Sequence, residues 1–272
     1  MFNIETYLDS LPYDTKEIDV SHRGITVIDV TKFKNLKILR CEFNQLTSLH
    51  LNKNLQTLWC FHNQLTSLHL NENLQTLYCS DNQLSSLQLN ENLKTLNCDN
   101  NQLTSLLLNE NLETLNCNNN QLTSLHLNEK LQKLYCINNQ LSSLQLNRNL
   151  QTLCCYDNQL TSLHLNKNLQ ELYCYNNQLI SLHLNEKLET IDYDENPIYE
   201  IINSGVIEII KQKLQVLNQF RYLYYSLKFK TRLRDLLWVN IREPKIRIKY
   251  SHDYLVEHLH EDTDLDELLN NW

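Results

Sequence analysis

"LNCNNNQLTSLHLNEKL", which runs from Leu115 to Leu131, is the stretch that decides how this 272-residue chain folds. The same pattern returns as "LYCSDNQLSSLQLNENL" from Leu77 and as "LYCYNNQLISLHLNEKL" from Leu172. Each copy holds one cysteine in the same place, and successive cysteines lie nineteen residues apart: Cys41, Cys60, Cys79, Cys98, Cys117, Cys136, Cys155 and Cys174. The stretch is therefore one unit of an internal repeat, and Cys154 stands outside its register.

The spacing within each unit is L-x-x-L-x-C-x-x-N-x-L-x-x-L-x-L, as in the segment that starts at Leu112. This spacing and period resemble those of the leucine-rich repeat family. Less regular copies flank the regular ones, with Ile18 and Val20 filling the slots before them and Ile191 and Tyr193 after them. We therefore expect an N-terminal cap at residues 1–14, a solenoid of ten units at residues 15–202 and a helical C-terminal module with an acidic tail at residues 203–272.

The Leu-x-Cys alternation in each unit predicts a short strand, because residues two apart point to the same face of a strand. Stacked units then form a parallel sheet with strands about 4.8 Å apart. A unit this short leaves no room for an outer helix, so we expect an outer face of extended chain or short strands. The resemblance implies that a recurrent asparagine forms a ladder that bonds the backbone of adjacent loops. Its positions are Asn44, Asn63, Asn82, Asn101, Asn120, Asn139, Asn158, Asn177 and Asn196.

Composition and charge restrict the class of protein. The chain has only two glycines and three prolines, so its turns need another residue. Asparagine is the candidate, because it tolerates the left-handed backbone conformation. We find no signal-peptide pattern at the N-terminus and no apolar run of the roughly 18 residues that span a bilayer, so we expect an intracellular protein without a membrane segment. The formal net charge of −8 argues against nucleic-acid binding by the whole molecule.

The repeated cysteines are predicted to be buried, reduced fillers of the core. A zinc site needs converging ligands, usually from close C-x-x-C pairs, and the chain has no such pair. Cys154 is the one cysteine expected on the exposed face, but its neighbours Tyr135, Tyr156 and Tyr173 offer no base to activate it, which argues against an enzyme. Histidines that alternate with leucine are expected to be solvated on the outer side, so we predict no metal and no cofactor. These are His50, His69, His126, His164 and His183.

Binding residues are expected on the exposed sheet face, in the variable slots on either side of each cysteine. Two aromatic clusters occur there, separated by a belt of asparagine and aspartate. The predicted protein-binding residues are Phe43, Trp59, Phe61 and Tyr78 in the first cluster and Tyr135, Ile137, Tyr156, Tyr173 and Tyr175 in the second. Exposed tryptophan and tyrosine on a rigid support favour a protein partner. The alternative is that neighbouring rings only stack on one another and stabilise the sheet.

After the last repeat the apolar spacing becomes helical, with Ser204 as a candidate N-cap. The expected apolar face consists of Val206, Ile210, Leu214 and Leu217. Residues 221–249 carry nine Lys or Arg against two acids, and residues 252–272 carry seven acids and no Lys or Arg. Interleaved basic and aromatic residues would allow nucleic-acid contact through residues 221–249. That alternative is weaker, because the leucines of the same stretch need burial and the opposite charges can pair with each other.

Short repeats that read N-Q-L-T-S-L are similar to those of bacterial effectors and of giant viruses of amoebae. The ending, "LRDLLWVNIREPKIRIKYSHDYLVEHLHEDTDLDELLNNW", resembles a terminal segment of mimivirus-type giant viruses. These resemblances imply a host protein as partner, and the host cytoplasm or a virion as location. Some such effectors carry a C-terminal ubiquitin ligase domain with a catalytic cysteine, whereas the last cysteine here is Cys174, inside the repeats. We therefore expect a non-enzymatic protein-binding scaffold; the alternative is an adaptor that recruits host ubiquitin machinery through its C-terminal module.

Overall fold

A computed structural model of the chain describes residues 2–199 and 207–237, without the side chains of residue 221 and residues 224–237. The chain divides into two units, residues 1–215 and 216–272. All the strands of the described residues lie in the first unit, whose sheet positions the candidate binding residues.

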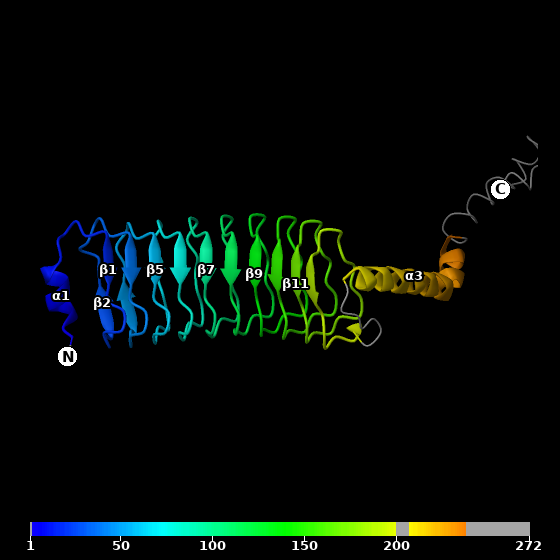
Figure 1. The fold of residues 1–272 in the computed structure, drawn as a ribbon, viewed down its shortest axis with the longest axis horizontal. Helices are drawn as coiled ribbons and strands as arrows, with labels where there is room; N and C mark the ends of the chain where they lie inside the picture. The colour runs from blue at the N-terminus through cyan, green and yellow to red at the C-terminus, as the bar shows by residue number, and fades with distance from the viewer. Residues whose placement is uncertain (1, 200–206, 238–272) are drawn as a thin grey trace, which may run out of the picture. The chain divides into compact units, whose positions relative to one another are not determined.

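One parallel sheet extends along the first unit (Figure 1). It has ten strands in the order β1-β3-β5-β6-β7-β8-β9-β10-β11-β12. These are β1 (Glu17–Asp19), β3 (Ile38–Arg40), β5 (Thr57–Trp59), β6 (Thr76–Tyr78), β7 (Thr95–Asn97), β8 (Thr114–Asn116), β9 (Lys133–Tyr135), β10 (Thr152–Cys154), β11 (Glu171–Tyr173) and β12 (Thr190–Asp192). Paired residues lie one repeat apart, as Thr95 and Thr114 do, so equal slots of successive units are neighbours in space.

The core forms because each short strand turns its middle residue inward. Leu115 and Cys117 are both fully buried, and Cys117 N donates to Tyr135 O at 2.8 Å, which continues the pairing beyond the strand. All nine cysteines are buried and free, so the predicted burial of the repeated cysteines is confirmed. No single turn could bury its leucines alone, and the stability of the sheet therefore comes from contacts between neighbouring turns.

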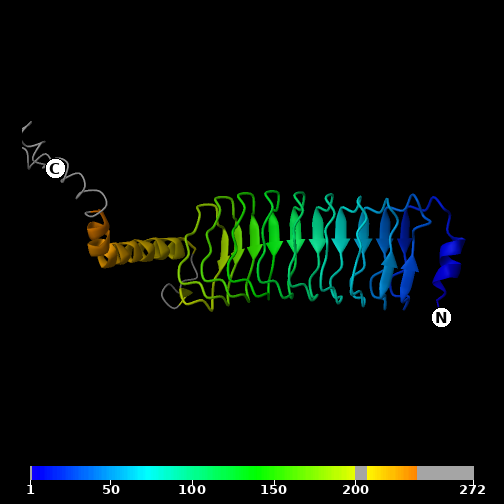
Figure 2. The same ribbon diagram turned by 180° about the vertical axis from the view of Figure 1, so that it is seen from behind.

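The outer side of the solenoid is extended chain with little strand pairing (Figure 2). Near the N-terminus, β2 (Val27–Asp29) and β4 (Ser48–His50) form a separate two-stranded parallel sheet. Farther along, His164 bridges to Gln145 and His183. The predicted outer face of extended chain and short strands is confirmed. The repeated histidines of this side are exposed, as expected.

The predicted asparagine ladder is present just beyond the strand ends. Asn120 Nδ2 donates to Cys98 O at 3.1 Å, Cys117 O at 3.2 Å and Asn118 O at 2.9 Å. Asn120 Oδ1 accepts from Leu103 N at 2.9 Å. Each buried side chain of the ladder thus bonds backbone groups of its own turn and of the preceding turn, which removes the cost of burying them unpaired.

The residue before each ladder asparagine has a left-handed backbone conformation, with φ between 48° and 55°. Asparagine occupies four of these positions, which supports the expectation that it replaces glycine in the turns: Asn100, Asn119, Asn138 and Asn176. The remaining positions hold Phe43, His62, Asp81, Asp157 and Glu195, and His22, which precedes Arg23 in the first turn, has the same conformation. Bulky side chains such as Phe43 rarely adopt this conformation, so neighbouring contacts must hold them there.

A second asparagine ladder, which the sequence analysis did not predict, holds the opposite turn of each unit. Asn128 Nδ2 donates to Asn109 O at 2.5 Å and to Leu112 O at 3.0 Å. The positions are Asn52, Asn71, Asn90, Asn109, Asn128, Asn147, Asn166 and Asn185. The signal was available, because asparagine follows the L-x-L pattern at every one of these repeats. Together the two ladders hold both chain reversals of each repeat unit.

A helix lies at the N-terminal end of the solenoid. α1 (Ile4–Ser10) begins after Asn3, whose side chain accepts from Thr6 N at 3.0 Å. Leu8 on this helix is buried, and Lys32 Nζ lies 2.5 Å from Asp9 Oδ1. The segment expected to form the N-terminal cap therefore contains a short helix.

The second helix, α3 (Ile207–Leu237), follows the last strand in sequence. In its first turns Ile210 and Leu214 are buried, as the helical spacing predicted, and Lys211 Nζ donates to Leu188 O at 3.2 Å. Leu217 is partly buried. The predicted N-cap Ser204 and the apolar Val206 lie outside the described residues.

Candidate protein-binding surface

Four side chains of each turn reach the outer surface of the sheet. They are the first and third residues of the strand, the residue after the cysteine position, and the left-handed residue that follows. In the turn of β9 these are Lys133, Tyr135, Ile137 and Asn138. The strand pairing places equal slots side by side, so each slot forms a row along the solenoid.

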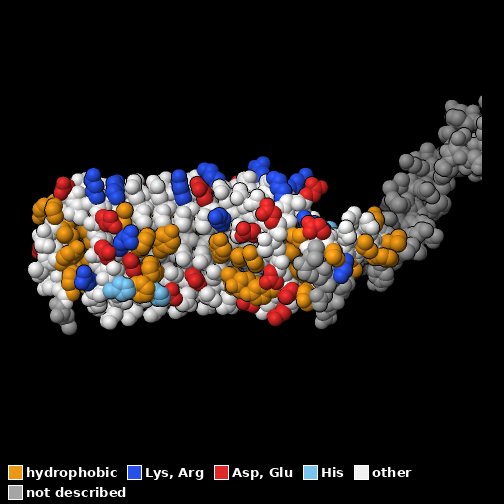
Figure 3. Space-filling model, viewed as in Figure 1, with side chains coloured by type: hydrophobic (Ala, Val, Ile, Leu, Met, Phe, Trp, Pro, Cys, Tyr) orange, Lys and Arg blue, Asp and Glu red, His pale blue; other side chains and the backbone are white. Residues whose placement is uncertain are grey.

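The first predicted cluster, which we call the N-terminal patch, consists of two ring pairs on neighbouring turns, Phe43 with Phe61 and Trp59 with Tyr78. Hydrophobic side chains gather on this part of the surface (Figure 3). The ring centroids of Trp59 and Tyr78 lie 5.7 Å apart, and those of Phe43 and Phe61 lie 5.2 Å apart, both edge to face. Phe43 is 42% exposed, and the other three side chains are partly buried.

Further side chains close over the N-terminal patch. The guanidinium of Arg40 lies 3.9 Å from the Trp59 ring centroid, and its Nε bonds Glu17 Oε1 at 3.1 Å. Phe43 is stacked between His22 and His62, with centroid distances of 4.3 and 4.6 Å. Most rings of this patch therefore contact other side chains of the protein, as the alternative to partner binding predicts.

The second cluster, Tyr135, Ile137, Tyr156, Tyr173 and Tyr175, lies over β9 to β11, and we call it the C-terminal patch (Figure 3). All five side chains are partly buried. Tyr156 and Tyr175 stack with centroids 4.1 Å apart. Burial, the Tyr156 hydroxyl and the nearby Asp157 and Asp192 raise the pKa of Tyr175 to about 12, so its phenol stays protonated at neutral pH.

Cys154 lies in this patch but is not on the exposed face, which corrects the expectation from the sequence. It pairs in register with Tyr135 on one side and Tyr173 on the other, and only 8% of it is exposed. The small thiol is covered because both neighbours in its row are large aromatic residues. Burial and the carboxylate of Glu171 raise its pKa to about 11. A buried, protonated thiol is a poor nucleophile.

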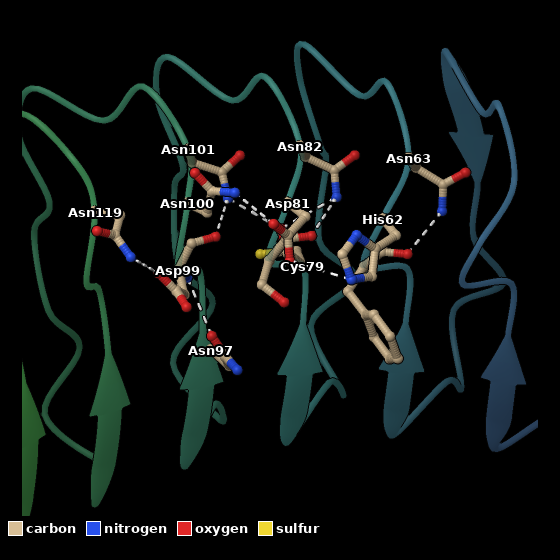
Figure 4. A network of polar contacts seen from close by, with 12 residues as sticks. His62, Asn63, Cys79, Asp81, Asn82, Asn97, Asp99, Asn100, Asn101 and Asn119 are labelled. Atoms are coloured by element: carbon tan, nitrogen blue, oxygen red, sulfur yellow. Dashed lines mark hydrogen bonds and ion pairs between the residues drawn. The ribbon is translucent and has the colours of Figure 1, made fainter.

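A polar belt separates the two patches, and its side chains bond one another from turn to turn (Figure 4). His62 Nε2 lies 3.5 Å from Asp81 Oδ2, and Asn100 Nδ2 donates to the other oxygen of Asp81. Asn119 Nδ2 donates to Asp99 Oδ1 at 2.9 Å. These contacts fix the belt as a rigid polar strip between the patches.

The described residues hold no group of three or more His, Cys, Asp or Glu that could bind a metal ion. Burial raises the pKa of the Cys117 thiol, and its neighbour Cys136 raises it further. The core thiols are thus kept from the thiolate form that metals and electrophiles require. Neither of the helices in the described part of the chain is long and apolar enough to cross a membrane.

The basic segment at residues 221–249 is described only in part. Residues 238–249 and the side chains of residues 224–237 lie outside the described residues, and so does the acidic tail. Tyr222 is 79% exposed and Leu223 is 53% exposed. The burial expected for the leucines of this stretch is therefore not observed at Leu223. The predictions of nucleic-acid contact and of adaptor function through this module stay predictions.

The sequence matches no protein-family model and no curated protein. Among solved structures, the functional domain of InlJ from Listeria monocytogenes, which includes a cysteine ladder, aligns with a TM-score of 0.59 and 32% identity over 65% of this chain and 46% of that chain. The leucine-rich repeat domain of APL1B aligns with a TM-score of 0.60 and 20% identity, over 71% and 73% of the chains. A Shigella effector leucine-rich repeat domain aligns with a TM-score of 0.51 and 25% identity, over 58% and 75%.

The chain spans less than half of the InlJ chain that it resembles, so this likeness concerns the repeats. Both chains stack cysteines: here Cys98, Cys117 and Cys136 occupy successive turns, and the InlJ domain includes a cysteine ladder. The in-register parallel sheet, the extended outer side and the likeness to three leucine-rich repeat structures lead to one conclusion. The chain folds as a leucine-rich repeat solenoid with a helix on its C-terminal side.

Proposed function

We propose that the protein is a non-enzymatic scaffold that binds a protein partner through the outer surface of its sheet. The observation that carries this proposal is the C-terminal patch, in which four tyrosines and an isoleucine lie on three consecutive turns, within or just after the strands, and remain partly exposed. Such side chains contribute large contact areas at a low cost in conformational entropy.

The rigid support beneath the patch favours binding. Tyr135 and Tyr173 lie at the ends of paired strands, and the ladder bonds of Asn139, Asn158 and Asn177 hold the turns that follow. A surface that is already ordered loses little entropy when a partner docks. Aromatic residues with these properties supply most of the energy of typical protein interfaces.

The structural relatives agree with this class of function, since one of them is the repeat domain of a Shigella effector. The finer parts of the proposal go beyond them: we propose a host protein as the partner, with the intracellular location and giant-virus origin that the sequence resemblances imply. Because most of the C-terminal module lies outside the described residues, the structure favours no second function.

Affinity capture from a host-cell lysate, followed by mass spectrometry, tests the proposal. The full-length chain is compared with a variant that carries Tyr156→Ala, Tyr173→Ala and Tyr175→Ala. We expect a protein captured by the unmodified chain to be lost with the variant, while the circular dichroism spectrum is unchanged.

The matched control changes apolar residues that are also exposed but belong to other slots of the repeat: Leu107→Ala and Ile180→Ala, whose side chains are 83% and 55% exposed. This control should capture the same protein as the unmodified chain. Capture that survives the three tyrosine substitutions would show that the partner binds elsewhere and would overturn the proposal.

A further inference from the structure

The two patches differ in whether they already hold a cation. In the N-terminal patch, Arg40 lies over the face of Trp59 and is paired with Glu17. Its charge is therefore neutralised within the protein, and one face of the indole is covered. This patch has little capacity left for a charged group of a partner.

The C-terminal patch differs, because no cation among the described residues pairs with the carboxylates that border it. In the turns of β9 to β12, the outward slots hold five acids and one lysine. The acids are Asp157, Glu171, Asp192, Asp194 and Glu195, and the lysine is Lys133. Within the described part of the chain, none of these acids forms an ion pair, and no lysine or arginine lies over a tyrosine ring of the patch.

The hydrogen bonds of this region leave the negative charge in place. Asp157 Oδ1 accepts from Asn176 Nδ2 at 2.6 Å, and Asp192 Oδ1 accepts from Asp194 N at 3.4 Å. Both donors are neutral. Burial and the charge of Asp192 raise the pKa of Asp194, as expected for carboxylates that lie close together without a cation.

Aromatic side chains bordered by carboxylates are suited to lysine and arginine. The ring face attracts a cation, the carboxylate pairs with it, and the alkyl stem packs on the apolar surface. A phosphate backbone would be repelled by the same five acids. The chemistry of this surface therefore selects a cationic segment of a protein.

On these grounds, and resting on the function proposed above, we infer that the C-terminal patch and its carboxylate rim bind a segment of the partner that is rich in arginine or lysine. The rim consists of Asp157, Glu171, Asp192, Asp194 and Glu195. The N-terminal patch stabilises the sheet and takes no part in this recognition.

The probe is a library of random short peptides displayed on phage and selected on the full-length chain. Enriched peptides are synthesised, and their binding is titrated by fluorescence anisotropy at low and at high salt. We expect the selected peptides to be enriched in arginine and lysine. Their binding should weaken on the order of tenfold at high salt, because screening shortens the reach of exposed charges.

A rim variant carries Glu171→Gln, Asp192→Asn and Asp194→Asn, which keep the shapes of the side chains. We expect it to bind the selected peptides on the order of tenfold more weakly, as three exposed charge pairs are lost. The matched control removes the same number of charges in exposed loop positions of other turns: Glu72→Gln, Glu91→Gln and Glu110→Gln. It should bind as the unmodified chain does.

The outcomes separate this inference from the proposed function. Peptides that depend on Tyr156 and Tyr175 but show no preference for basic residues would overturn the inference and leave the function standing. Peptides that bind independently of these tyrosines would overturn both. If no peptide is enriched but the chain self-associates in sedimentation and the rim variant does not, the occupant is a second copy, which also overturns the inference.

Discussion

The substitution Asn120→Ala measures what one rung of the first asparagine ladder contributes. Asn120 is 8% exposed and bonds one amide and three carbonyl groups of the backbone. Alanine removes all four contacts at once. The structure indicates that only one of the losses is expensive.

Each of the three carbonyls keeps a second donor: Asn101 Nδ2 at 3.1 Å from Cys98 O, Asn139 Nδ2 at 3.0 Å from Cys117 O, and Asn100 N at 3.0 Å from Asn118 O. Leu103 N–H is different, because its acceptor within the described residues is Asn120 Oδ1. A buried donor left without a partner costs about 1–3 kcal/mol. We therefore expect Asn120→Ala to lower the free energy of unfolding by about 2 kcal/mol.

Asn120→Asp separates the roles of the two amide atoms. It keeps an acceptor for Leu103 N–H but replaces the donor by a carboxylate oxygen that faces three carbonyls. A buried charge without a partner is more costly than a missing hydrogen bond. Asp should therefore destabilise the protein more than Ala does at neutral pH, and the difference should narrow in acid as the carboxylate is protonated.

Urea unfolding followed by circular dichroism gives the free energies, and amide hydrogen exchange reports the local effect at Leu103. Gln121→Ala is the matched control, since Gln121 is the exposed neighbour and its backbone N–H bonds Leu103 O at 2.9 Å in either case. If Asn120→Ala is as stable as this control, or if Asn120→Asp is the milder change, the account of the ladder is wrong.

Three further results are expected. A thiol reagent should leave Cys154 unmodified in the native protein at neutral pH, because burial and Glu171 raise its pKa to about 11; rapid labelling that requires no unfolding would contradict its burial. Glu195→Gly should stabilise the protein by about 1 kcal/mol in urea unfolding, since φ is 52° at this position and left-handed geometry is costly for residues with a Cβ; unchanged or lower stability would argue against strain there. Hydrogen bonds from the Ser21 amide and hydroxyl hold the pKa of Asp19 below its usual 3.8, so the stabilisation by Asp19 is present above that value and is lost as the pH falls through the folded pKa. The free energies of unfolding of Asp19→Asn and of the unmodified chain should therefore become equal in acid. A difference that stays constant with pH would rule this linkage out.

The repeat made the sheet predictable because its constraint is geometric. Cys117 and its equivalents recur without slippage, so successive turns have to stack in register, and the inward position of Leu115 follows from strand alternation. The second ladder could have been predicted by the same reasoning, since Asn128 and its equivalents recur as strictly as the first ladder does. Nothing in local propensity identifies it, because its bonds reach the preceding turn.

The surface was less predictable, because its properties depend on neighbours that are distant in sequence. Slot alternation assigned Cys154 to an outward slot, but the expectation that it is exposed was wrong. Its burial depends on the size of Tyr135 and Tyr173, one repeat away on either side. The stack of Tyr156 on Tyr175 likewise joins two turns. The neighbours in the same row decide whether an aromatic ring is covered or is exposed to a partner. The sequence of a single repeat unit does not contain this information.

A stacked fold of this kind separates stability from recognition. Inward slots are nearly identical from turn to turn because each turn supports the next, whereas outward slots can change without altering the backbone that carries them. The row that contains Asn116, Tyr135, Cys154 and Tyr173 changes from amide to phenol to thiol while its strands keep the same register. A cation paired inside the protein, as Arg40 is, adds to the stability of its own patch and reduces what that patch offers to a partner. The carboxylates around the C-terminal patch have no such internal cation among the described residues, so their charge remains available for a partner to neutralise.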